Sequence, residues 1–185
     1  IGRHNSIAHV PGMKERTIVV NGVSKAYAMT GWRIGFIAAP EWIVKGCNKL
    51  QGQYTSGPCS VSQKAAVAAY TASQDCVEDM RKAFERRRDL IVSLIKEIPG
   101  LDVNVPEGAF YVFPKCSSFF GKSDGVRTIC NSTDFALYLL EVGHVATVAG
   151  DAFGDSECFR ISYATSDDNI REAMARVKAA LAKLK

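Results

Sequence analysis

The chain has 185 residues, and 23 lysines and arginines against 19 aspartates and glutamates give it a formal charge of only +4. With 47% hydrophobic and 23% charged residues, its composition is that of an ordinary globular protein and argues against extensive disorder. No apolar run approaches the roughly 20 residues that a membrane-spanning helix needs. The one dense basic run, Arg86–Arg88, has no interleaved aromatic residues that could stack on bases. We therefore expect neither membrane nor nucleic-acid partners.

The six cysteines and three histidines form no metal-binding pattern. No two cysteines show the C-x-x-C spacing that is typical of structural zinc sites, and the histidines share no spacing with them. We predict that the protein has no metal site. In a chain that can build a core, such cysteines indicate reduced, buried thiols and a cytoplasmic protein.

The first part of the chain alternates short β-branched runs with helical patterns. Its predicted elements are an irregular stretch (1–16), a buried strand (17–20) ended by Asn21-Gly22, a second strand (33–39), a helix from Pro40 with an apolar face at Ile43, Cys47 and Leu50, and an alanine-rich helix (60–73). These strands are too few to enclose a core, so residues 1–75 are predicted to be an incomplete domain.

A long amphipathic helix opens the second part, because apolar residues recur at intervals of three and four from Val77 to Ile98. After it, the sequence predicts strands over 101–105 and 108–113, a loop over 117–128, a helix capped by Ser132 or Thr133 and ending at Gly143, strands over 145–148 and 158–162, and a helix from Ser166-Asp167 with a buried stripe at Ile170, Met174, Val177, Leu181 and Leu184. Residues 76–185 could therefore close a compact α+β domain of their own.

Lys25 lies in a predicted turn directly after a strand, among small neighbours, and Arg33 follows eight residues later. A partly desolvated lysine is a nucleophile that forms Schiff bases with aldehydes, and a planar guanidinium suits a phosphate. That pair would suit pyridoxal phosphate. Taken alone, the same residues equally describe an exposed turn lysine and a strand-end arginine in an ion pair.

The order of residues from Gly22 to Gly35, GVSKAYAMTGWRIG, resembles the cofactor-lysine signature of class I/II aminotransferases, the aspartate aminotransferase superfamily of fold type I. The stretches 107–114 (EGAFYVFP) and 159–164 (FRISYA) resemble segments of the same enzymes' C-terminal part. The resemblance implies an α/β fold. Residues 1–75 would be the trailing strands and helices of the large, cofactor-binding domain, and residues 76–185 the small α+β C-terminal domain.

The resemblance also implies roles for single residues. Lys25 would form the Schiff base with pyridoxal 5′-phosphate and then act as general acid/base. Arg33 would bind the cofactor phosphate with help from Ser24, although relatives often carry a serine where this chain has Gly22. Arg160, which without the resemblance would be a paired structural arginine, would hold the substrate α-carboxylate. Phe110 or Tyr111 would line the site, and the segment 54–56 would approach the partner subunit's cofactor.

The implied reaction is transamination between an amino acid and a 2-oxo acid in a longer, homodimeric enzyme. We expect this chain to be a C-terminal fragment that is inactive alone, because the family's aspartate for the ring nitrogen has no counterpart in it. Other chemistry of the same fold type, such as a β-lyase or elimination reaction, stays open. So do a non-catalytic module that binds a partner through an exposed apolar face and a Schiff-base aldolase acting on a phosphorylated substrate.

Overall fold

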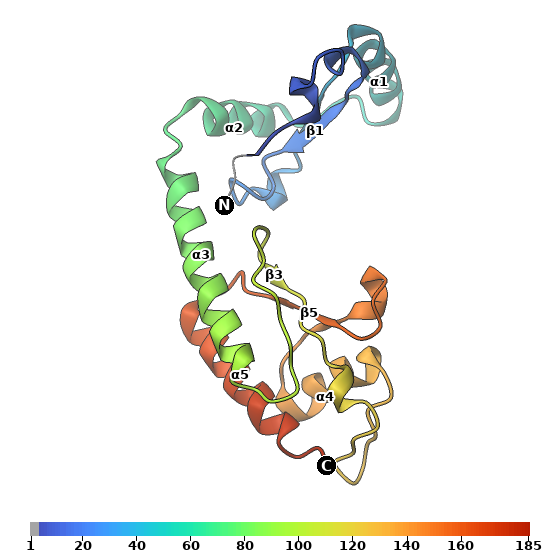
Figure 1. The fold of residues 1–185 in the computed structure, drawn as a ribbon. Coiled ribbons are helices and arrows are strands. Elements are labelled where there is room, and N and C mark those ends of the chain that lie inside the picture. The colour runs from blue at the N-terminus through green and yellow to red at the C-terminus, as the bar shows by residue number, and fades with distance from the viewer. Residues whose placement is uncertain (1–3) are drawn as a thin grey trace. The chain divides into compact units, whose positions relative to one another are not determined.

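The computed structural model describes residues 4–185; the predicted irregularity of residues 1–3 lies outside them. The chain divides into two compact units, one ending at Asp79 and the other running from Met80 to Lys185 (Figure 1). The assignment of residues 1–75 to a large domain and of residues 76–185 to a small one stays a prediction.

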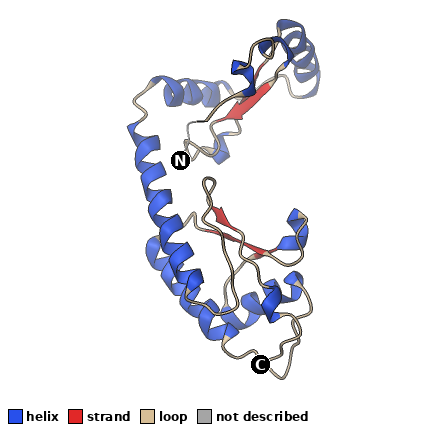
Figure 2. Ribbon diagram, viewed as in Figure 1, coloured by secondary structure: helices blue, strands red, loops and turns tan. Residues whose placement is uncertain are grey.

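The first unit is a two-stranded antiparallel ribbon followed by two helices (Figure 2). Its elements are β1 (Val19–Gly22), β2 (Gly35–Ala38), α1 (Glu41–Tyr54) and α2 (Ser60–Thr71). Val19 lies opposite Ala38, and Gly22 lies opposite Gly35. Both predicted helices are confirmed, with Pro40 as the N-cap of α1.

The prediction that the first strand of this unit is buried is wrong. The side chain of Val20, expected inside a buried strand, is 76% exposed, and α1 has no buried residue. Asn21 and Gly22 belong to β1 instead of ending it. A single ribbon can bury its side chains only against a further layer, and the described residues of this unit supply no such layer over Val20.

The second unit packs three helices around a small antiparallel sheet. Its elements are α3 (Asp75–Lys96, which starts within the first unit), β3 (Tyr111–Val112), α4 (Ser132–Gly143), β4 (Val148–Ala149), β5 (Phe159–Ser162) and α5 (Asp167–Leu181). The central strand of the sheet is β5, between β3 and β4. None of the helices within residues 4–185 is both long and apolar enough to cross a bilayer.

Several predicted boundaries in this unit are wrong. Residues 101–105 form no strand beyond an isolated bridge from Asp102 to Lys115, and the strand predicted over 145–148 begins only at Val148. Asn131, not Ser132 or Thr133, caps α4, because its Oδ1 accepts from the backbone N–H of Asp134 at 2.9 Å. The hydroxyl of Ser132 instead donates to Asp151 at 3.0 Å. The strand at 158–162 and the long helix from residue 77 are confirmed.

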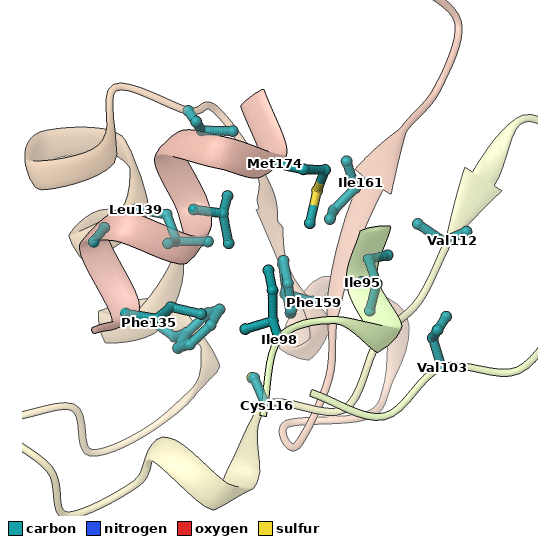
Figure 3. Packing of buried hydrophobic residues seen from close by; sticks show 14 of the residues in the cluster. Ile95, Ile98, Val103, Val112, Cys116, Phe135, Leu139, Phe159, Ile161 and Met174 are labelled. Atoms are coloured by element: carbon teal, nitrogen blue, oxygen red, sulfur yellow. The ribbon is translucent and has the colours of Figure 1, made fainter. Parts of the chain in front are cut away.

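The hydrophobic core lies in the second unit, between α3, α4, α5 and the sheet (Figure 3). Phe135 of α4 packs against Phe159 of β5, with 4.8 Å between the ring centroids, and both side chains are fully buried. Ile95 brings α3 into the same cluster. The burial of the predicted stripe is confirmed, since all five of its residues lie in this core, although α5 ends at Leu181 and Leu184 follows it.

Only two of the six cysteines are buried, so the prediction of buried thiols is wrong for Cys47, Cys59, Cys76 and Cys130. The two buried thiols lie beside the isolated β-bridge between Lys115 and Cys158. Burial raises the pKa of Cys116 to about 12 and that of Cys158 to about 11. All six cysteines are unpaired thiols.

Candidate active site

Lys25 lies in a turn that begins directly after β1, and its side chain is exposed. The backbone N–H of Ala28 donates to the carbonyl of Lys25 at 3.1 Å and closes this turn. Val23, two residues before the lysine, is fully buried, and its N–H donates to the carbonyl of Ile34 at 3.4 Å. The turn is therefore fixed to the start of the second strand on its N-terminal side.

Gly22 allows the close approach that brings this turn to the second strand. A Cβ atom at this position would lie 2.8 Å from the carbonyl oxygen of Ile34 and 3.2 Å from the Cα of Gly35. Such a contact would force the backbone apart, because real Cβ atoms do not approach carbonyl oxygens so closely. A serine here, which the enzymes that the sequence resembles often carry, would require the strands of this chain to separate locally.

Tyr27 holds the other side of the turn. Its hydroxyl donates to Oε1 of Gln74 at 2.8 Å, and its ring meets that of Tyr70 on α2 edge to face, at 5.1 Å between centroids. Phe36 of β2 contacts the same Tyr70 ring at 5.6 Å. Sequence reasoning missed this aromatic support, because its residues come from segments that lie far apart in the sequence.

Arg33 follows a short 3-10 helix (Thr30–Trp32) and has a left-handed backbone, with φ 55° and ψ 48°. Its Nη1 donates to the carbonyl of Thr30 at 2.7 Å. Within residues 4–185 this guanidinium makes no ion pair with a carboxylate. The alternative that Arg33 is a strand-end arginine in an ion pair therefore finds no support. The guanidinium keeps donors for an external anion.

One open cleft of about 580 Å³ joins the predicted cofactor residues. Lys25, Ser24 and Arg33 all line it, together with Asn21 and the glycines of the strand ends. The full lining is Val20, Asn21, Gly22, Ser24, Lys25, Ala26, Arg33, Ile34 and Gly35. Two cations and a hydroxyl without an acidic side chain suit a phosphate, so the residues present fit a phosphorylated aldehyde.

A second open cleft of about 710 Å³ also uses Arg33, together with residues of α1 and the segment after it, including Thr55. Tyr54, which begins the segment predicted to approach a partner's cofactor, is 83% exposed. This arrangement does not test the predicted role of residues 54–56.

Arg160 belongs to the second unit, in the central strand β5, opposite Val148 of β4. Its guanidinium carbon lies 4.3 Å from the ring centroid of Tyr111 and 4.2 Å from that of Phe153. Tyr111 was one of the two aromatic residues expected near the substrate. Phe153 was missed, because it comes from a loop whose course the sequence does not reveal.

A lysine, a hydroxyl and an arginine therefore line one cleft whose lining contains no acidic side chain. The family model for aminotransferase class I and II matches residues 2–177, and the chain belongs to this family.

Individual relatives are similar over almost the whole chain. It is 51% identical over 175 residues to an aspartate aminotransferase of Rhizobium meliloti strain 1021, covering 94% of this chain and 43% of the relative. It is 50% identical over 186 residues to a bifunctional aspartate aminotransferase and glutamate/aspartate-prephenate aminotransferase of Petunia hybrida, covering 98% and 39%. The chain thus spans less than half the length of these relatives.

Solved structures show the same fold. A crystal structure of the aspartate aminotransferase from Rhizobium meliloti matches with a TM-score of 0.91 at 50% identity, over 95% of this chain and 44% of that one. The aromatic aminotransferase from Pyrococcus horikoshii OT3 matches with a TM-score of 0.86 at 42% identity, over 98% and 47%. The predicted α/β fold class is therefore confirmed.

Proposed function

We propose that this chain is the part of a pyridoxal 5′-phosphate-dependent aminotransferase that carries its reactive lysine. The observation that supports this most directly is the meeting of Lys25, Ser24 and Arg33 in one cleft without a carboxylate. The substrates would be an amino acid and a 2-oxo acid. Aspartate is the first donor to test, because relatives similar over the whole chain carry its name.

Bound pyridoxal phosphate would supply an aldehyde that captures primary amines and a ring that accepts the electron pair released at the substrate α-carbon. Lys25 would hold the aldehyde carbon through Nζ and, once displaced by substrate, would move a proton with the same atom. Arg33 would bind the phosphate through its remaining N–H groups, and the Ser24 hydroxyl would donate a further hydrogen bond. Arg160 would bind and orient the substrate α-carboxylate.

The same cleft supports the proposal that this chain alone transfers amino groups very slowly. Its lining contains no aspartate or glutamate that could keep a pyridine nitrogen protonated. Two cations would tend to favour the deprotonated ring instead. The predicted homodimer and cytoplasmic location of the complete enzyme stay predictions.

The test is a pyridoxal phosphate titration followed by borohydride reduction and peptide mapping. We expect saturable binding with the label on Lys25, lost in Lys25→Ala and weakened in Arg33→Ala. Lys49→Ala, which removes an exposed lysine outside the cleft, is the matched control and should bind as the original chain does. Labelling spread over surface lysines, unchanged by Lys25→Ala, would refute the assignment.

A further inference from the structure

Arg160 stands between two aromatic rings that come from opposite neighbours of its strand. Tyr111 belongs to β3 on one side of β5, and Phe153 follows β4 on the other. Both ring centroids lie within 4.3 Å of the guanidinium carbon, well inside the range of a cation–π contact. The rings therefore cover the guanidinium without using any of its N–H groups.

The N–H groups of Arg160 make no hydrogen bond or ion pair within the part of the chain that the structure describes. Most other arginines of the second unit are paired, for example Arg86 with Asp167 at 3.0 Å and Arg176 with Glu172 at 2.8 Å. Among the described residues of this unit, Arg171 also has no such partner, but it is exposed to solvent. Arg160 is also half-buried, so its N–H groups are only partly accessible to solvent. Because two rings lie this close to the guanidinium, we expect a ligand to approach its edge, where the parallel N–H groups match a planar carboxylate.

The ring of Phe153 is held in place by the loop that carries it. The N–H of Gly150 donates to the carbonyl of Cys158 at 2.9 Å, and the N–H of Asp155 donates back to the carbonyl of Gly150 at 3.2 Å. Phe113 meets Phe153 edge to face, with 6.0 Å between centroids and an interplanar angle of 87°. A 46% exposed phenylalanine would otherwise turn freely, so this bracing fixes its contact with Arg160.

We propose that Tyr111 and Phe153 are positioning residues, which hold the guanidinium plane of Arg160 so that its free edge receives a planar carboxylate. The inference deepens the proposed function and rests on it for the identity of that carboxylate, the α-carboxylate shared by the amino acid and the 2-oxo acid. Neither ring takes part in bond making; each acts through the arginine.

The experiment follows the Arg160 Nε–H resonance of the ¹⁵N-labelled chain, assigned by its loss in Arg160→Lys, during titration with 2-oxoglutarate. We expect a signal displaced by the two ring currents, and a saturable response to the ligand. Phe153→Leu should move the signal and weaken binding roughly two- to fivefold, the worth of one cation–π contact. Phe153→Trp, which restores a π face, should recover both.

Phe120→Leu is the matched control, because it removes a partly buried ring of the same unit that has no contact with Arg160. An Nε–H signal unaffected by Phe153→Leu, an equal dissociation constant in that variant, or no saturable response in the original chain would each overturn the inference. If Phe153→Leu does not fold, as judged by the loss of its folded NMR spectrum, carboxylate binding is compared between Phe153→Trp, Phe153→Tyr and the original chain instead. In that comparison, both aromatic variants should bind as the original does, and weaker binding by both would overturn the inference.

Amino transfer by the full-length protein is measured separately. If carboxylate binding depends on Phe153 but the full-length protein transfers no amino group from any amino acid tested, the proposed function fails and the positioning role stands. If transfer occurs but Phe153→Leu changes neither KM nor carboxylate binding, the positioning role fails and the function stands.

Discussion

Gly150→Ala should strongly destabilise the second unit, because the position has no room for a side chain. A Cβ atom there would lie 2.0 Å from the carbonyl oxygen of Asp155 and 2.2 Å from that of Cys158. Ordinary contacts of this kind are about 3.4 Å or longer, so two backbone carbonyls would have to move by more than about 1 Å. Both belong to the loop that carries Phe153.

The expected loss is about 2 kcal/mol. Overpacking against a fixed environment typically costs about 1–3 kcal/mol, and replacing glycine by alanine returns about 0.4–1 kcal/mol by restricting the unfolded chain. Because rigid backbone and not a flexible side chain meets the new atom, the upper part of the first range applies. For a unit of this size, about 2 kcal/mol lowers the unfolding temperature by roughly 10 °C.

The assay separates the units, because both tryptophans, Trp32 and Trp42, belong to the first one. Thermal and urea unfolding would be followed by tryptophan fluorescence and by far-UV circular dichroism. Gly150→Ala should lower the dichroism transition of the helical second unit and leave the fluorescence transition in place. Gly108→Ala is the control, since a Cβ there meets nothing within 4 Å. Equal midpoints for the two variants would refute the packing argument.

Three further predictions concern other parts of the chain. Tyr138→Phe should cost about 1 kcal/mol in urea unfolding, because the buried hydroxyl donates to the carbonyl of Ala180 at 2.9 Å. The hydrogen bond from Arg86 lowers the pKa of Asp167, so this carboxylate stabilises the fold above its unfolded pKa of about 4, and the contribution is lost as the pH falls through the lower, folded pKa. Asp167→Asn should therefore be less stable than the original chain at pH 7, with the difference shrinking below about pH 4. Iodoacetamide should modify Cys59 first, since the N–H groups at the start of α2 lower its pKa, whereas the two buried thiols should react only after unfolding.

The helices could be predicted from the sequence because their signals are local. The recurrence of apolar residues from Val77 to Ile98 and the stripe of the last helix depend only on the period of the α-helix. The strands were harder, because β3 and β4 contain two residues each and form only where β5 lies between them. A strand forms only when it is hydrogen-bonded to a neighbouring strand, and a short stretch of sequence does not show which segment that neighbour will be.

That Lys25 and Arg33 lie close together could be predicted for a related reason. Lys25 and Arg33 are only eight positions apart, on either end of the connection between two paired strands, so a local motif places them in one cleft. The support from Tyr27, Tyr70 and Gln74 spans distant segments and left no such signal. The prediction of buried side chains failed where burial requires a further layer of structure over the strands, as the exposed side chain of Val20 shows.

The two arginines illustrate what a sequence leaves out about an anion site. Arg33 is exposed and tied by one hydrogen bond to Thr30, so its fork can adjust to a phosphate, whose oxygens accept from many directions. Arg160 has no such bond, but two aromatic rings lie close to its guanidinium, and we expect this arrangement to favour a ligand that lies in the guanidinium plane. The residue type is the same in both places, so we expect any difference in anion selectivity to come from the groups that hold each arginine. Exchanging those supporting groups, and not the arginine, is therefore the sharper test of which anion each proposed site accepts.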